Sequence, residues 1–110
     1  MNYYMVTKTR EIKIEKVELL NDHYQNKNEN GQIYDEYSLE INPTPDKKKT
    51  YIQSGYSIIL TKNIYYYLKR IQNDEAKFYK YLMSKEKDLR KVKFKDDNWS
   101  NTKFSIISKE

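Results

Sequence analysis

The stretch that decides the predicted fold is Thr61–Lys109, TKNIYYYLKRIQNDEAKFYKYLMSKEKDLRKVKFKDDNWSNTKFSIISK. Its first part has four apolar residues at the i, i+3, i+4, i+7 spacing that brings side chains to one face of a helix. These residues are Ile64, Tyr67, Leu68 and Ile71. The spacing predicts an amphipathic helix with this face buried.

A second helix is predicted directly after the turn at residues 72–74. Thr61 is a suitable N-cap for the first helix, and Asn73 is a suitable N-cap for the second. Asp74 and Glu75 then lie in a first helical turn, where carboxylates interact favourably with the helix dipole. The apolar stripe of this helix is expected to comprise Phe78, Tyr81, Leu82 and Leu89.

The C-terminal part of the stretch has the period-two alternation of β-strands. Lys91–Lys95 and Thr102–Ile106 alternate in this way, and residues 96–101 between them are rich in turn formers. The strand-like segment Tyr56–Leu60 precedes the helix pair. This order predicts an α+β fold with a winged helix-turn-helix layout, in which a helix pair (61–89) precedes a β-hairpin wing (91–109).

The N-terminal half, residues 10–60, is predicted to be β-rich and to belong to the same single domain, 1–110. Residues 1–10 are expected to form a loose arm or a first strand. The alternation in residues 10–20 slips by one position, which favours a strand with a bulge, although a short helix remains an alternative. Residues 32–42, with Tyr37, Leu39 and Ile41 on one face, are expected to pair with residues 50–60 as a hairpin.

The amino-acid composition and the distribution of charge exclude some functions for this protein and favour others. The chain has no cysteine, which excludes disulfides and zinc–thiolate sites. It also lacks an apolar run long enough for a membrane span, so we expect a cytoplasmic protein. The net charge is −1 in residues 1–60 (8 − 9) and +6 in residues 61–110 (13 − 7). A positive charge concentrated on the helix pair and hairpin is typical of nucleic-acid binding.

The second predicted helix carries a basic row along one face. Its lysines Lys77, Lys80, Lys87 and Lys91 fall within about 80° of one another at roughly 100° per residue. The row predicts contacts with DNA phosphates, and an ordinary solvated helix face is the alternative. Because Asp74 and Glu75 would repel phosphates, we expect this helix to support a DNA contact more than to lead it.

The predicted wing offers a lysine ladder and a polar tip. The ladder and tip comprise Lys91, Lys93, Lys95 and Lys103 with Asn98 and Asn101. Such a hairpin can straddle a DNA backbone and reach into the minor groove. The alternative is an edge strand whose lysines prevent aggregation.

Catalysis has little support in the sequence. The one histidine, His23, lies in an Asn-rich segment, and two glycines cannot form a phosphate-binding loop. Tyr65–Tyr67 could stack on bases, but consecutive helical positions face different directions, which favours a structural role. We therefore expect a protein that is not an enzyme and has no cofactor or metal.

The layout of residues 56–109 resembles winged helix-turn-helix proteins. Together with the small size, basic charge and Lys/Asn-rich composition, it is similar to relaxosome accessory proteins of conjugative plasmids from low-GC Gram-positive bacteria. The resemblance implies sequence-specific binding of double-stranded DNA repeats, dimerisation and recruitment of a relaxase. The alternative function is a phage or plasmid protein that binds and inhibits a host protein such as a nuclease.

Overall fold

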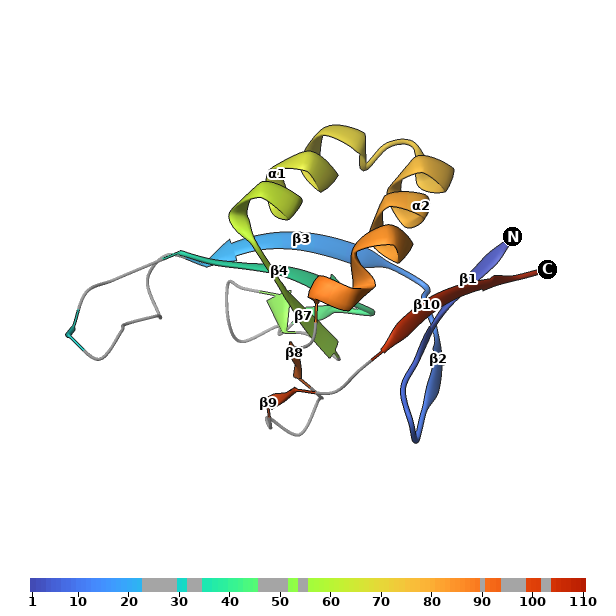
Figure 1. The fold of residues 1–110 in the computed structure, drawn as a ribbon, viewed down its shortest axis with the longest axis horizontal. Coiled ribbons are helices and arrows are strands. Elements are labelled where there is room, and N and C mark those ends of the chain that lie inside the picture. The colour runs from blue at the N-terminus through green and yellow to red at the C-terminus, as the bar shows by residue number, and fades with distance from the viewer. Residues whose placement is uncertain are drawn as a thin grey trace.

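The computed structural model describes residues 1–22, 30–31, 35–45, 52–53, 56–89, 91–93, 99–101 and 104–110. It is a mixed α+β structure with a β-rich N-terminal half, followed by two α-helices (Figure 1). The elements are β1 (Asn2–Val6), β2 (Glu11–Lys13), β3 (Val17–Asp22), β4 (Glu36–Ile41), β5 (Thr44–Pro45), β6 (Ile52–Gln53), β7 (Tyr56–Leu60), α1 (Lys62–Ile71), α2 (Glu75–Lys85), the 3-10 helix η1 (Glu86–Asp88), β8 (Lys91–Lys93), β9 (Trp99–Asn101) and β10 (Ser105–Lys109).

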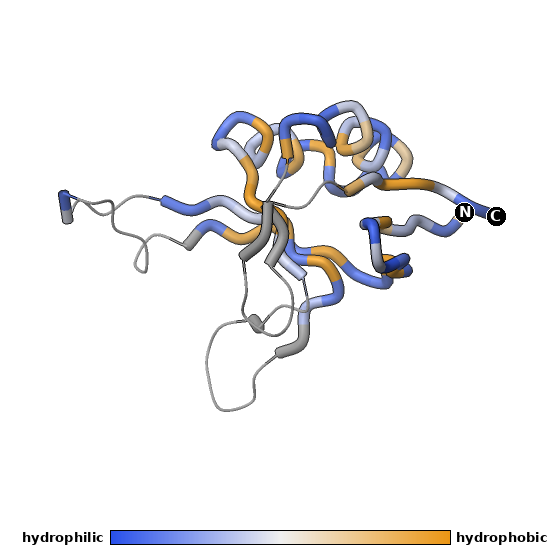
Figure 2. The backbone as a smooth tube through the Cα atoms, turned by 60° about the horizontal axis from the view of Figure 1, so that its bottom comes forward, coloured by the Kyte–Doolittle hydropathy of each residue, from blue (hydrophilic) through white to orange (hydrophobic). Residues whose placement is uncertain are grey.

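The larger sheet has five antiparallel strands in the order β3-β4-β7-β8-β9. The predicted pairing of residues 32–42 with residues 50–60 is confirmed, since Leu39 lies opposite Ile58 in the β4–β7 ladder. Both helices cover one face of this sheet (Figure 1). Apolar side chains of the sheet and helices form one core, and Figure 2 shows hydrophobic stretches of the chain gathered between these layers. The predicted inward positions Tyr37, Leu39 and Ile41 are all buried.

The smaller sheet joins the two ends of the chain in the order β10-β1-β2. β1 pairs antiparallel with β10, so that Asn2 lies opposite Lys109 and the two termini lie side by side (Figure 1). Tyr3 of β1 stacks on Tyr79 of α2, with ring centroids 3.8 Å apart and ring planes 10° from parallel. Of the two predictions for residues 1–10, the first strand is therefore confirmed.

Residues 10–20 form two strands that belong to different sheets. The prediction of one bulged strand is wrong in this respect, because β2 lies in the three-stranded sheet and β3 in the five-stranded sheet. Asn42 fixes the break between them. Its side-chain oxygen accepts hydrogen bonds from the amides of Glu15 (2.7 Å) and Lys16 (3.2 Å), and its amide donates to the carbonyl of Lys13 (2.9 Å). The slip in alternation therefore marks the point where the chain changes sheets.

The helix boundaries follow from their caps. The Thr61 hydroxyl accepts a hydrogen bond from the Ile64 amide at 3.3 Å, as predicted. The predicted cap Asn73 is wrong, because the residue that caps α2 is Asp74, whose carboxylate accepts from the Lys77 amide at 3.2 Å. Asp74 has the extended backbone of an N-cap residue, with φ −107° and ψ 96°.

The buried faces of the helices are rotated slightly from the predicted ones. In α1, Tyr65 is buried with Ile64, Leu68 and Ile71, while Tyr67 is half-buried. In α2, Tyr79 is buried beside Phe78 and Leu82, and Tyr81 is half-buried. The displaced rings of Tyr67 and Tyr81 meet edge to face at 4.3 Å and join the two helices.

The predicted C-terminal hairpin is wrong in its pairing. β8 pairs with β7 on one side and with β9 on the other, and β9 occupies residues predicted to be the turn. The second predicted strand begins instead as β10 at Ser105 and pairs with β1. Phe104 and Ile106 are buried in the core, and the Ile106 amide donates to the Glu86 carboxylate at 3.1 Å. A winged-helix arrangement is therefore not confirmed.

Candidate nucleic-acid interface

The lysine row predicted on the second helix lies on the outer surface. Lys77 and Lys80 project from α2 and are exposed, opposite the buried residues Phe78 and Leu82. The α-helix ends at Lys85, so the predicted row continues into η1, where Lys87 is also exposed. Lys77, Lys80 and Lys87 are thus on accessible elements, although they do not lie on one uninterrupted helix.

Lys87 lies beside a hollow that the sequence did not predict. The hollow has a volume of about 540 Å³ and is lined by Val6, Thr7, Lys8, Glu86, Lys87, Phe104 and Ser105. Lys8 comes from the turn between β1 and β2, which brings a second ammonium group to the same depression. The Glu86 carboxylate in this hollow is already hydrogen-bonded to the Ile106 amide.

A basic row on α1 is the feature that the sequence interpretation missed. At about 100° per residue, Lys62, Tyr66, Lys69 and Arg70 fall within about 100° of one another on the side opposite Leu68. All four are exposed, and α1 contains three basic residues and no acidic residue. Within the described residues, Lys62, Lys69 and Arg70 form no ion pair with a carboxylate.

Tyr66 is held at the centre of this row by other aromatic rings. It is 48% exposed, yet it contacts Tyr65 edge to face at 5.1 Å and Tyr37 at 5.9 Å between ring centroids. The Lys69 ammonium lies 6.0 Å from the centre of the Tyr65 ring, which places a cation next to the same cluster. The ring of Tyr66 is therefore supported from beneath while its outer side faces solvent.

Tyr37 anchors this aromatic cluster from β4. Its hydroxyl donates a hydrogen bond to the Asp35 carboxylate at 3.0 Å. Burial, assisted by the Asp35 hydrogen bond and charge, raises the pKa of Tyr37 from 10.0 to about 12. The hydroxyl consequently stays protonated throughout the neutral range and keeps its bond to Asp35.

This shift predicts a loss of stability at high pH. Because the pKa of Tyr37 is higher in the folded chain, the unfolded chain releases the proton first, and the free energy of unfolding should fall as pH rises from 10 to about 12. Tyr37→Phe should make this fall shallower in denaturant titrations at a series of pH values. Lysines titrate in both proteins, so the difference between the two profiles isolates Tyr37. Superimposable slopes would contradict the assignment.

The predicted wing residues are only partly placed. Lys91 and Lys93 lie in β8, an inner strand of the five-stranded sheet, and Asn101 lies in β9. Lys95, Asn98 and Lys103 are outside the described residues, as is His23. Lys93 is in register with Ser57, whose hydroxyl bonds Glu40 on the sheet face opposite the helices. The register gives no support for one surface that combines the predicted wing lysines with those of α2.

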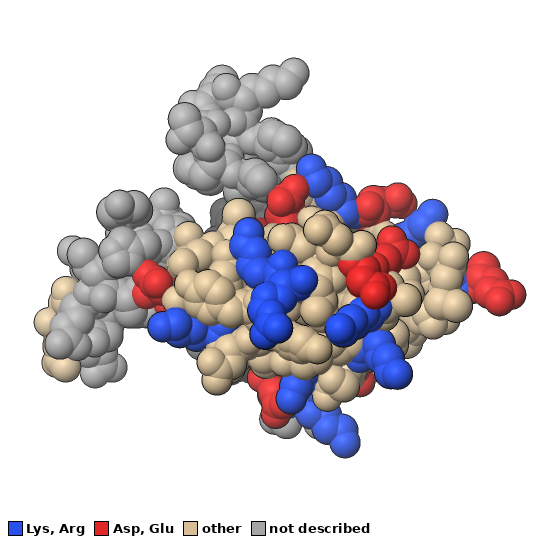
Figure 3. All heavy atoms as spheres, turned by 90° about the horizontal axis from the view of Figure 1, so that it is seen from above, with Lys and Arg blue, Asp and Glu red and all other residues tan. Residues whose placement is uncertain are grey.

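The helix side of the molecule carries both basic and acidic side chains. Figure 3 shows a group of Lys and Arg side chains near the centre of this face, with carboxylates to the right of it and also at the upper, left and lower parts of the face. Asp74 and Glu75 contribute acidic groups at the start of α2. The run from residue 61 to residue 73 contains no Asp or Glu, and this absence was the sequence signal that could have identified α1.

The comparisons with known proteins give no relative for this chain. No family model, curated protein or solved structure matches it. None of the described helices combines the length and apolar character needed to cross a membrane. In the same described ranges, no three His, Cys, Asp or Glu side chains are grouped as a metal site would require.

Proposed function

We propose that this protein binds double-stranded DNA through the outer surface of its helix pair. The observation that carries the proposal is the α1 row of Lys62, Lys69 and Arg70 around the exposed Tyr66. Arg and Lys side chains and Tyr hydroxyls are standard donors to DNA phosphates. A helix without acidic residues presents these donors without local repulsion of the phosphate backbone.

In this proposal α1 makes the main contacts with the duplex, and α2 adds further phosphate contacts. Lys77 and Lys80 extend the basic surface along α2. Asp74 and Glu75, however, lie at the start of α2 and would repel phosphates approaching that end. The duplex therefore contacts the outer side of α1 together with Lys77 and Lys80, and the Asp74 and Glu75 carboxylates weaken its contact next to the interhelical turn.

A winged-helix mode of binding is the more specific form of the proposal. The β8–β9 hairpin, which carries Lys91, Lys93 and Asn101, would then act as the wing, although its register gives no support for a surface shared with α2. In a role in conjugation, the protein would recognise bases in a plasmid transfer origin and recruit a relaxase to that site. Binding to repeated half-sites would require a dimer, in which two copies present their α1 rows in succession.

A titration with duplex DNA at two salt concentrations tests the proposal. If Lys62, Lys69, Arg70, Lys77 and Lys80 each neutralise one phosphate, the slope of log K against log salt should be about −4.5. Random duplex and fragments containing direct repeats from a transfer origin should be compared. Tighter binding to the repeats would support the sequence-specific, conjugation-related form.

Absence of duplex binding at low salt would contradict the proposal. It would favour the alternative of a protein partner, because an exposed Tyr66 beside Arg70 is also typical of protein interfaces. A pull-down from host lysate with the wild type and a Tyr66→Ala variant would then identify the partner that depends on this ring.

A further inference from the structure

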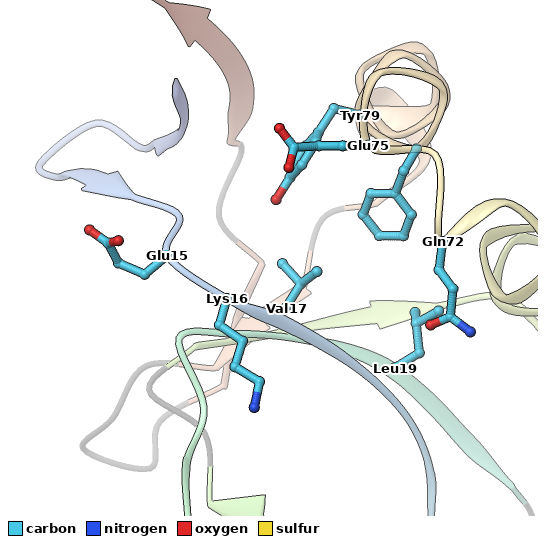
Figure 4. A pocket seen from close by; sticks show the side chains of 8 residues that line it. Glu15, Lys16, Val17, Leu19, Gln72, Glu75 and Tyr79 are labelled. Atoms are coloured by element: carbon cyan, nitrogen blue, oxygen red, sulfur yellow. The ribbon is translucent and has the colours of Figure 1, made fainter. Parts of the chain in front are cut away.

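A small pocket between β3 and the start of α2 differs in charge from the basic helix surface. It has a volume of about 200 Å³. Its lining residues are Glu15, Lys16, Val17, Leu19, Gln72, Glu75, Phe78 and Tyr79 (Figure 4). The space suits a ligand of fragment size.

The polar side of the pocket is built by Tyr79 and Glu75. Both project from α2 toward the same side, and Val17 faces them from β3 (Figure 4). Tyr79 is only 7% exposed, and its ring is fixed by stacking on Tyr3. Among the described residues the Tyr79 hydroxyl has no hydrogen-bond partner. Every fully buried polar side-chain atom in this part of the chain does have a partner, so the hydroxyl is not fully buried. The hydroxyl is therefore accessible from the pocket.

The charge at this site is negative. Glu75 forms no ion pair with another described residue, whereas the Lys16 ammonium points away from the pocket and lies 3.1 Å from Glu18 (Figure 4). Glu15 also lines the pocket, but its carboxylate points away from Glu75 and lies 3.8 Å from the Lys13 ammonium, so Glu75 supplies the negative charge (Figure 4). The partial positive charge of the α2 N-terminus is offset by Asp74 and Glu75, whose combined charge of −2 exceeds it.

The floor of the pocket is apolar. Val17 and Leu19 come from the core side of β3, and Phe78 comes from α2. An aromatic ring beside a carboxylate is a favourable environment for an organic cation. Burial, together with the Glu75 charge, raises the pKa of Tyr79 to about 12, so its hydroxyl remains neutral at physiological pH.

We infer that this pocket binds a small primary amine. Its ammonium group pairs with the Glu75 carboxylate and donates a hydrogen bond to the Tyr79 hydroxyl. Its apolar stem lies on Val17, Leu19 and Phe78. This site is separate from the proposed DNA surface and does not depend on it.

A series of ligands that share one stem tests the inference. Hexylamine, 1-hexanol and hexanoate should be titrated into the full chain and followed by amide chemical-shift changes in NMR. Hexylamine should shift the amides of Leu19, Phe78 and Tyr79 and bind about two- to fivefold more tightly than hexanol, as expected for one ion pair with the exposed Glu75 carboxylate. Hexanoate should bind more weakly than either.

Two variants separate the contributions of the charge and the hydroxyl. Tyr79→Phe keeps the ring that stacks on Tyr3 and should weaken hexylamine about threefold or more. Glu75→Gln should reduce the affinity for hexylamine to that for hexanol. Asp88→Asn, which removes an exposed carboxylate from η1, is the control and should leave the affinity unchanged. Equal binding of hexylamine and hexanol to the wild type, or no shift at these amides, would overturn the inference.

Discussion

Replacing Lys62, Lys69 and Arg70 together with glutamine lowers the affinity for duplex DNA by about 10²- to 10³-fold near 0.1 M salt if our proposal is correct. Each cation that neutralises one phosphate contributes roughly 0.9 decade of affinity at this salt concentration through counterion release. The three changes should also flatten the slope of log K against log salt by about 2.7. Filter binding or fluorescence anisotropy at several salt concentrations measures both quantities.

The triple variant should remain folded. All three residues are exposed and form no ion pair within the described residues, and glutamine has a helix propensity close to that of lysine and arginine. A loss of DNA binding would therefore report on the surface of α1. A thermal unfolding curve superimposable on that of the wild type would confirm that interpretation.

A second triple variant controls for the change in net charge. Lys13, Lys16 and Lys109 lie on strands or next to them and each is within 4 Å of a carboxylate, and their replacement by glutamine also lowers the net charge from +5 to +2. This control should lose much less affinity than the α1 variant. If both variants lose the same affinity for DNA, the effect comes from the net charge of the protein. If the α1 variant binds DNA as tightly as the wild type, α1 is not part of the interface.

The sequence predicted local structure correctly where the spacing of side chains is compatible with only one kind of helix cap or strand face. Thr61 caps α1 as expected, and the alternating residues of β4 bury the predicted face. Such features depend on neighbouring residues, whose spacing is visible in the chain. The caps and strands of the central region were therefore predictable, with Asn73 displaced by one residue because the adjacent Asp74 is equally suited to the role.

The strand partners were not predictable by the same reasoning. The alternation around Phe104 and Ile106 indicates a strand with one buried side, but it does not identify the neighbour. That neighbour is β1, about a hundred residues away, because Tyr3 stacks on α2 and brings β1 to the same core. A hairpin with the preceding strand was the nearest pairing in sequence, and the long-range contact replaced it.

The candidate site was predicted on one helix and missed on the other. Lys62 and Arg70 are each four residues from Tyr66, a spacing that places all three on one face of α1. Tyr65 is buried and Tyr66 is exposed, while Tyr67, which was predicted to be buried, is half-buried. Only the packing decided which of the three rings faces solvent.

Asn42→Ala should lower the free energy of unfolding by about 2.5–5.5 kcal/mol. The substitution removes the three side-chain hydrogen bonds that hold the change of sheets at Lys13, Glu15 and Lys16. Net losses of about 0.5–1.5 kcal/mol per bond account for most of the effect. Asn42 also has φ +52°, in the left-handed region that asparagine tolerates and alanine does not, which adds about 1 kcal/mol. Denaturant titration measures the sum.

A glycine variant separates the two causes. Asn42→Gly loses the same side-chain bonds but adopts positive φ without a Cβ, so it should be less destabilised than Asn42→Ala by about 1 kcal/mol. In both variants the amides of Glu15 and Lys16 lose their acceptor, and their hydrogen exchange should become faster than that of the Leu39 amide within β4. Because the ladders on either side remain, exchange at β2 and β3 should change less than at the break. Unchanged stability in both variants would mean that the sheet pairings alone determine where the chain leaves one sheet for the other.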